Sequence, residues 1–357
     1  MEKKKKKEEL GTLGVALMYV GAIMGAGFAS GREIWQFFGV FGKRGYIGVL
    51  LVGLLFVAVG FMTSNIARKL GTNDMGRVIV PGGNRVLSEA VGYFMAFLLF
   101  TVMITMTAAG GALVRQQFGL SRVLGGVLIA VLVIITVLGD FERVSKVFRF
   151  IMPALVVIVV GTCILVLCSD ITESGDVSLI EPSTLAPTWA LSAVLYLCYN
   201  LLAVVPIVAT ASVNAKGSRQ AVAGSALGGV FLAILAFVLV SAMLKDATFS
   251  NSLDMPMLGF SERISVIVNV LYTLALLCAI YAAATSNYYG FTTKLRDTPK
   301  KKWIIVGGAA LGFACGLIGF SNVVAYMFPI EGYLGIAILV MVTVNYFKVC
   351  VFGSAQR

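Results

Sequence analysis

Four glycines stand within eleven residues of the first apolar run of the chain, from Gly21 to Gly31. Each costs a helix up to about 1 kcal/mol relative to alanine, so the cluster favours an unwound stretch. Backbone groups that are released inside a membrane need partners other than lipid, and a bound solute or cation is one such partner. A packing seam of small residues at Gly21 and Gly25 is the alternative interpretation.

A second interruption is predicted in the apolar run 188–214, because Pro206 has no N–H to donate to the carbonyl of Leu202. A proline kink by itself is common in membrane helices. Polar side chains on the same segment favour a cavity, and these are Tyr196, Tyr199 and Asn200. Interruptions at corresponding places in two halves of a chain indicate the binding site of a transporter.

Oxygen-bearing groups that suit a small cation occur together near the end of the apolar run 259–291. The hydroxyls of Thr285 and Ser286 and the carbonyl of Ala282 are hard ligands of the kind that Na⁺ takes. Hydrogen bonding of the two hydroxyls to the preceding helical turn is the alternative interpretation.

Charged residues inside apolar runs are candidates for function, and this chain has few of them. Arg32 and Glu33 follow the glycine cluster, and Glu331 lies in the last apolar run. We expect these residues toward the outer side of the membrane, where Arg32 and Glu331 would pair as a gate over the solute. A static pair that anchors two helix ends is the alternative.

Membrane-spanning helices must position these segments, as the composition of the chain indicates. Of its 357 residues, 59% are hydrophobic and 13% are charged, and the mean hydropathy is +0.95. These values exclude an ordinary soluble protein, and we expect an all-α polytopic membrane protein. Runs of about 20 apolar residues span a bilayer. Ten such runs are predicted, at 12–38, 46–69, 88–117, 121–138, 145–168, 188–214, 219–244, 259–291, 303–320 and 323–349.

The charged residues predict the orientation of the chain. With both termini in the cytoplasm, most of the 28 Lys and Arg residues fall in cytoplasmic segments. The long outer loop 169–187 contains four acidic residues and no Lys or Arg. We therefore expect cytosolic tails at 1–11 and 351–357. The net charge of +11 then reflects topology, and no nucleic-acid partner is expected.

Two five-run units, 12–168 and 188–350, are predicted. The interrupted runs, which are the first and the sixth, then occupy corresponding places. Because each unit has an odd number of runs, the second unit must be inverted relative to the first. The expected fold is a ten-helix, five-plus-five inverted repeat with discontinuous first and sixth helices.

Several other classes of protein are not indicated by the residue types. The chain has no histidine, and its six cysteines form no C-x-x-C pair, so neither a metalloenzyme nor a disulfide framework is expected. No nucleophile, base and orienting group can be identified that would converge on one place. We expect neither an enzyme nor an organic cofactor.

The pattern resembles the amino acid–polyamine–organocation superfamily, whose members have the LeuT-type fold. More closely, the stretch from Gly25 to Phe38, with the sequence GAGFASGREIWQFF, is similar to the first-helix signature of bacterial YkvI-like membrane proteins, which are candidate amino acid permeases. The resemblance covers nearly the whole chain by topology, but only this motif is specific. It implies a multi-pass protein of the bacterial cell membrane.

The resemblance also implies ligands. The Na⁺ site shared by such symporters would be formed by Gly21, Met24, Ala282, Thr285 and Ser286. Substrate would lie against the broken helices and their neighbours, at Met24, Gly25, Ala26, Gly27, Ser30, Thr101, Thr105, Tyr199, Asn200 and Tyr281. Phe28 stands where a second sodium site has Asn, so one coupling ion is expected. Some relatives use a Lys in the fifth helix for proton coupling, and Lys146 and Arg149 leave that option open.

The function expected from the sequence is Na⁺-coupled symport of a small amino acid or similar zwitterion by alternating access. A proton-coupled amino acid permease is one alternative. A ligand-sensing membrane subunit that keeps the transporter fold, and signals to a partner protein, is another. The sequence predicts neither the particular solute nor the oligomeric state.

Overall fold

The chain is helical almost throughout. The computed structural model describes residues 9–139, 141–171, 177, 180–293, 295 and 298–353, with the side chains of 141–152 left out. The α-helices are α1 (Thr12–Ile23), α2 (Ala26–Ala29), α3 (Arg32–Phe37), α4 (Lys43–Leu70), α5 (Met75–Ile79), α6 (Arg85–Phe118), α7 (Arg122–Leu138), α8 (Phe141–Cys168), α9 (Trp189–Val213), α10 (Ser218–Met243), α11 (Ala247–Ser252), α12 (Pro256–Ile264), α13 (Val266–Thr292), α14 (Lys301–Gly316), α15 (Phe320–Asn322) and α16 (Phe328–Tyr346). Short 3₁₀ and π turns join some of them, at Gly39–Phe41, Pro81–Gly83, Val323–Met327 (η4) and Phe347–Val351 (η5).

The first apolar run is interrupted, as its glycines predict. Helix α1 ends at Ile23, and the amide of Gly25 donates to the carbonyl of Ile23 (2.7 Å) instead of continuing the helical pattern to Gly21. A second change of direction follows at Gly31, whose φ of 81° lies in the left-handed region that favours glycine. The run therefore consists of three short helices, and the carbonyl of Gly21 loses its helical donor at the first break.

The prediction that the sixth run is discontinuous is wrong. Helix α9 is unbroken from Trp189 to Val213, with Pro206 inside it. Proline removes only the hydrogen bond to Leu202, and such a loss is tolerated in membrane helices where neighbouring groups can compensate. Pro206 therefore leaves the helix whole.

The prediction of one helix over 259–291 is also wrong. Helix α12 ends at Ile264, and Ser265 has an extended backbone (φ −169°, ψ 158°). The Ser265 side chain accepts a hydrogen bond from the amide of Val268 and so begins α13. The polar segment 261–263 precedes this turn, but a hydropathy average hides it because long apolar stretches lie on both sides.

The structure is of the membrane type, but it does not by itself establish ten spans. Within the described residues, six helical segments are long and apolar enough to cross a bilayer. These are Lys43–Leu70, Arg85–Phe118, Trp189–Val213, Ser218–Met243, Val266–Thr292 and Phe320–Val351. Shorter apolar helices are Thr12–Ile23, Arg122–Leu138 and Pro153–Cys168. The ten-helix inverted repeat stays a prediction.

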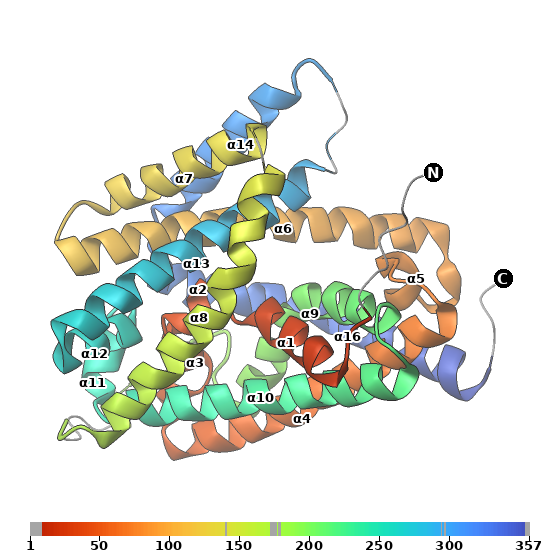
Figure 1. The fold of residues 1–357 in the computed structure, drawn as a ribbon, viewed down its shortest axis with the longest axis horizontal. Coiled ribbons are helices and arrows are strands. Elements are labelled where there is room, and N and C mark those ends of the chain that lie inside the picture. The colour runs from red at the N-terminus through yellow and green to blue at the C-terminus, as the bar shows by residue number, and fades with distance from the viewer. Residues whose placement is uncertain are drawn as a thin grey trace.

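The helices form two packed groups. Helices α1, α4, α9 and α10 contact one another, and α4 and α10 lie side by side along one edge of the molecule (Figure 1). Helices α6, α7, α13 and α14 form the second group. Helix α8 contacts α10 and α13, and α16 contacts α4 and α9. The space between the two groups is where the candidate site lies.

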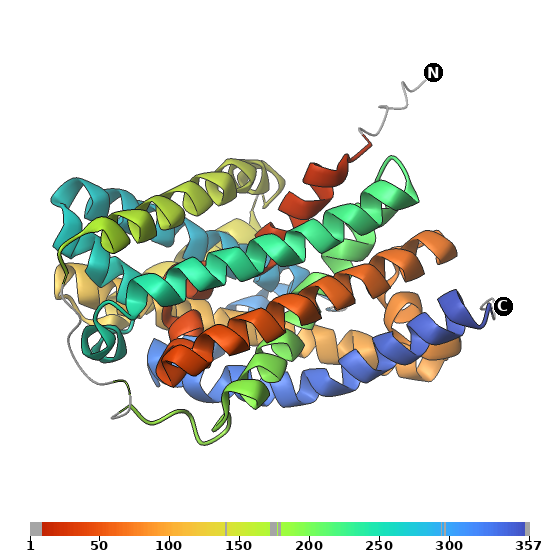
Figure 2. The same ribbon diagram turned by 90° about the horizontal axis from the view of Figure 1, so that it is seen from below.

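The beginning of α1 and the end of η5 lie toward the same end of the molecule (Figure 2). There Leu10 pairs with Ala215 at the α9–α10 turn, since Leu10 accepts from the amide of Lys216 and donates to Asn214. The start of the first span is thereby tied to the second half of the chain.

Some sequence predictions lie partly or wholly outside the described residues. They concern the basic segment 1–8, the acidic positions 172–176, residues 354–357, and the side chains of Lys146 and Arg149. The boundaries of the two predicted units stay predictions.

Candidate functional site

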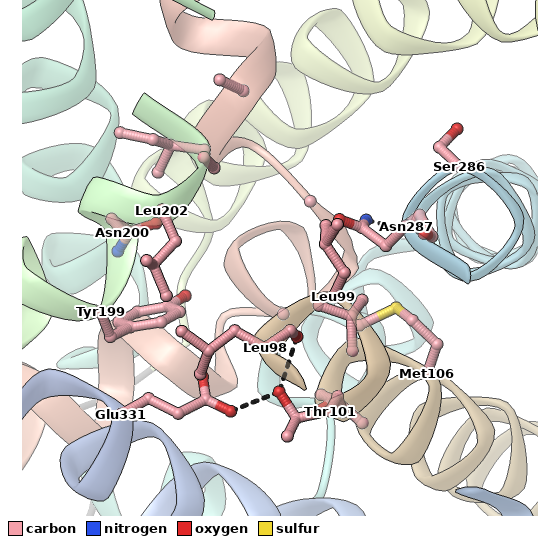
Figure 3. Close-up of a pocket in the computed structure, with 18 of the residues that line it drawn as sticks. Leu98, Leu99, Thr101, Met106, Tyr199, Asn200, Leu202, Ser286, Asn287 and Glu331 are labelled. Atoms are coloured by element: carbon pink, nitrogen blue, oxygen red, sulfur yellow. Dashed lines mark hydrogen bonds between the residues drawn. The ribbon is translucent and has the colours of Figure 1, made fainter. Parts of the chain in front are cut away.

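A cavity of about 440 Å³ lies between the two helix groups. Its walls come from the broken first span, α6, α9, α13 and α16 (Figure 3). Tyr199, Asn200 and Leu202 face it from α9, whereas Ser286 and Asn287 face it from α13. The volume suits a small solute, and concave sites of this kind between helices are where ligands bind.

Glu33 of α3 reaches back to the unwound stretch. Its Oε2 accepts a hydrogen bond from the hydroxyl of Tyr199 on α9 (2.6 Å). A Cβ at Gly27 would overlap the carboxylate of Glu33, so the absence of a side chain at Gly27 makes room for it. Glycine in this part of the first span therefore allows a carboxylate to lie against the backbone of α2.

A second carboxylate enters from α16. Glu331 Oε1 accepts a hydrogen bond from the Thr101 hydroxyl on α6 (2.6 Å), and the same hydroxyl lies 2.8 Å from the carbonyl of Leu98 (Figure 3). A threonine hydroxyl has one proton, which these two acceptors share. Glu331 is thus held by α6 but keeps acceptor capacity facing the cavity.

Aromatic rings flank the two carboxylates. The ring of Tyr199 stacks on Phe328 at a centroid distance of 4.6 Å and an interplanar angle of 13°. Phe37 stacks on Tyr199 at 6.1 Å. Both Tyr199 and Phe328 line the cavity, so this end of it combines two carboxyl groups with aromatic surface.

On the described part of the wall, no basic side chain faces the two carboxyl groups. Glu33 is 5% exposed and Glu331 is 9% exposed, and the described residues that line the cavity include no Lys or Arg. Ionised groups buried in a membrane are costly without a counter-charge. A proton, a metal cation or a positively charged solute would stabilise this end of the cavity.

The predicted pair between Arg32 and Glu331 is not formed. The Arg32 guanidinium donates instead to the carbonyls of Asn251 (3.4 Å) and Leu253 (3.2 Å), and more weakly to Gln36. The α3 backbone directs Arg32 toward the α11–α12 segment, whereas Glu331 faces Thr101. Arg32 therefore fastens the segment that follows α11 and does not neutralise the cavity.

The cavity brings together most of the residues that the sequence predicted for substrate and Na⁺. Those on its wall are Gly21, Gly25, Ala26, Gly27, Thr101, Thr105, Tyr199, Asn200, Ala282 and Ser286, and the predicted gate residue Glu331 is there as well. Four predicted residues are not on the wall, and these are Met24, Ser30, Thr285 and Tyr281.

Two of these four have polar groups engaged elsewhere. The Ser30 hydroxyl donates to the carbonyl of Gly27 (2.8 Å) and so closes the end of α2. The Tyr281 hydroxyl bonds to Thr136 of α7 (2.5 Å). Neither side chain is placed to bind a solute in this structure, and both act in packing the helices around the cavity.

The predicted cation ligands contain an unsatisfied group. The Thr285 Oγ1 is fully buried and has no hydrogen-bond partner among the described residues. Its helical neighbours Ala282 and Ser286 face the cavity, as does Gly21, whose carbonyl has lost its helical donor. A buried hydroxyl without a partner is costly. These oxygen-bearing residues fit a small hard cation such as Na⁺.

The sequence predicted Glu33 as an intramembrane charge but gave no function for it. Its hydrogen-bond donor in the cavity, Tyr199, is 166 positions away in the chain. Phe328 was missed altogether. An aromatic residue in an apolar run gives no signal that separates a cavity wall from ordinary packing.

Comparison with known proteins supports this architecture. No family model matches the chain. It is 26% identical over 331 residues to the uncharacterized membrane protein YkvI of Bacillus subtilis (strain 168). The aligned region covers 91% of this chain and 93% of YkvI. It is 24% identical over 326 residues to the uncharacterized protein YyaD of the same organism, with coverage of 91% and 94%.

Solved structures of Mhp1 share the fold. The inward-facing conformation of Mhp1 matches with a TM-score of 0.69 and 14% identity, over 97% of this chain and 77% of that one. A closed conformation with bromovinylhydantoin bound matches with a TM-score of 0.54, over 96% and 79%. That structure is described as a nucleobase-cation-symport-1 family transporter.

The fold and the central cavity therefore define the class: a helical protein of the membrane type with the LeuT-type fold that Mhp1 also has. Within that class, the resemblance to YkvI-like membrane proteins is confirmed along nine-tenths of the chain.

Proposed function

We propose that this protein is a secondary transporter that moves a small amine-bearing solute, such as an amino acid, through the cavity between the two helix groups. The observation that carries the proposal is the position of this cavity. It lies at the break of the first span, between two packed groups of helices. Alternating access in such folds proceeds by movement of one group around a central site.

The packing supports the predicted five-plus-five inverted repeat. If α1, α4, α6, α7 and α8 form one unit and α9, α10, α13, α14 and α16 the other, each packed group takes two helices from each unit. That exchange is expected when two equivalent units interlock. The common end at which α1 begins and η5 ends fits an even number of spans with both termini cytoplasmic.

Na⁺ is the coupling ion that we propose. Gly21 and Met24 would supply carbonyls from the end of α1, and Ala282, Thr285 and Ser286 would supply oxygens from α13. A ligand shifts a conformational equilibrium only by its different affinity for the two states. Ligands that come from both helix groups give such a difference, because they converge in only some conformations.

The present conformation resembles an inward-facing state. Helix α1 packs on α9 and α10, whereas α2 is the part of the first span that packs on α13. The higher TM-score with inward-facing Mhp1 than with its closed form agrees with this interpretation. Movement of α1 toward α13 would then bring the proposed Na⁺ ligands together.

Uptake into proteoliposomes tests the proposal. A panel of radiolabelled amino acids is offered with an inward Na⁺ gradient, with a pH gradient, and with neither. Accumulation driven by Na⁺ is the expected result. Accumulation driven only by pH would assign coupling to protons, for which the buried Glu33 and Glu331 are the candidates. Binding without flux would favour a ligand-sensing subunit.

A further inference from the structure

The substrate-facing end of the cavity has an unusual charge balance. Glu33 and Glu331 both line it, and each accepts a hydrogen bond from one side chain, Tyr199 and Thr101 respectively. A carboxylate accepts up to about four hydrogen bonds, so both retain free acceptor sites. No basic side chain is present on the described part of the wall to use them.

A substrate carboxylate is disfavoured at this end of the cavity. The resemblance implies that substrate lies against the residues from Met24 to Gly27. In the structure the Glu33 side chain already lies against Gly27, so closely that a Cβ there would overlap it. Two like charges at one place repel strongly when water is excluded. A substrate carboxylate must therefore lie elsewhere or be absent.

The aromatic wall favours a positive charge at the same place. Tyr199 and Phe328 are stacked, and Tyr199 donates its hydroxyl proton to Glu33. Aromatic faces attract ammonium groups, and more strongly where water is excluded. The carboxyl groups and the aromatic rings thus both favour binding of an ammonium group, and no basic side chain on the described part of the wall competes with it.

We propose that Glu33, Glu331, Tyr199 and Phe328 form an ammonium subsite, and that the amine is the obligatory group of the substrate whereas its carboxylate is dispensable. The substrate class is then organic amines, including amines without a carboxylate as well as amino acids. This inference rests on the proposed function, because it concerns the same cavity.

Matched compounds test the inference directly. Binding to the purified full-length protein is measured for alanine, leucine and phenylalanine, for the corresponding amines (ethylamine, isopentylamine and phenethylamine), and for the corresponding acids (propionate, 4-methylpentanoate and 3-phenylpropionate). For any skeleton that binds as the amino acid, the amine should bind within about tenfold of it. The acid should bind at least about tenfold more weakly, since it lacks the charge-assisted hydrogen bonds.

Two variants locate the effect. Glu33→Gln and Glu331→Gln should each weaken amine binding by about tenfold or more, because each removes one charged acceptor. Glu262→Gln is the matched control, since Glu262 is an exposed glutamate on α12 outside the cavity. Thermal unfolding with and without Na⁺ checks that the variants fold.

Several results would overturn the inference while leaving transport in place. These are acids that bind as well as amines, or both Gln variants binding amines normally. Normal binding combined with loss of pH-driven uptake would make the carboxylates proton carriers instead. If none of the compounds binds and none is transported, the proposed function itself fails together with the inference.

Discussion

Replacing Thr285 with Val tests the proposed cation site, because the substitution removes one hydroxyl and preserves the shape of the side chain. The Thr285 Oγ1 is buried and lacks a partner among the described residues. An unsatisfied buried polar group costs about 1–3 kcal/mol. Without Na⁺, Thr285→Val should therefore be as stable as the parent protein, or more stable by up to about that amount.

In Na⁺ the order of stability should reverse, and the parent protein should be more stable than Thr285→Val. A ligand present at 100 times its dissociation constant stabilises the folded state by about 2.7 kcal/mol. The parent protein should gain stability in NaCl relative to choline chloride at equal ionic strength, whereas Thr285→Val should lose most of that gain. Thermal unfolding in detergent, measured over a series of Na⁺ concentrations, gives both quantities.

Thr63 provides a matched control. Its hydroxyl on α4 is also fully buried and unpartnered among the described residues, but α4 carries none of the proposed cation ligands, which come from α1 and α13. Thr63→Val should keep the full response to Na⁺. An equal Na⁺ response in Thr285→Val and the parent protein would refute the reasoning, because the orphaned hydroxyl would then have no part in cation binding.

Three further predictions concern the packing and the site. Gly335→Ala should destabilise the protein by about 1–3 kcal/mol in thermal unfolding, because its Cβ would overlap the backbone of Cys198 on α9; Gly307→Ala, with nothing within 4 Å, should change little. Tyr199→Phe should reduce amine affinity several-fold in a binding assay because Glu33 loses its donor, whereas Tyr196→Phe should not, since the Tyr196 hydroxyl has no described partner. The last variant, Arg32→Met, is combined with Leu253→Cys in a cysteine-free background. It should speed labelling of the cysteine by an impermeant thiol reagent, because the carbonyls of Asn251 and Leu253 lose their donor. An unchanged labelling rate would mean that other contacts hold this segment.

Local chemistry accounts for what the sequence predicted well. The glycine cluster predicted an unwound stretch between Gly21 and Gly31, where the helix breaks between Ile23 and Ala26, because several glycines within a few turns weaken a helix regardless of its surroundings. The interruption predicted at Pro206 is wrong because neighbouring groups determine whether a proline breaks a membrane helix. Ser265 was missed because a single capping residue hardly alters the hydropathy of the run that contains it.

The site was predictable where it follows the helical period, and not otherwise. Ala282 and Ser286 are four residues apart and share the face toward the cavity, as expected for an α-helix. Tyr281 is one residue from Ala282, which turns it about 100° around the axis toward Thr136 of α7. The partners of Glu33 and Glu331 lie on other helices, so only the tertiary structure brings the two carboxylates into one cavity.

Concentrative uptake of one amine-bearing solute into proteoliposomes measures the central claim most directly. The parent protein, Thr63→Val and Thr285→Val are reconstituted at equal density, and uptake is followed with and without an inward Na⁺ gradient. The account predicts accumulation above equilibrium in the parent protein and in Thr63→Val only when the gradient is present, and none in Thr285→Val. Saturable binding of the solute without any flux in the parent protein would contradict it.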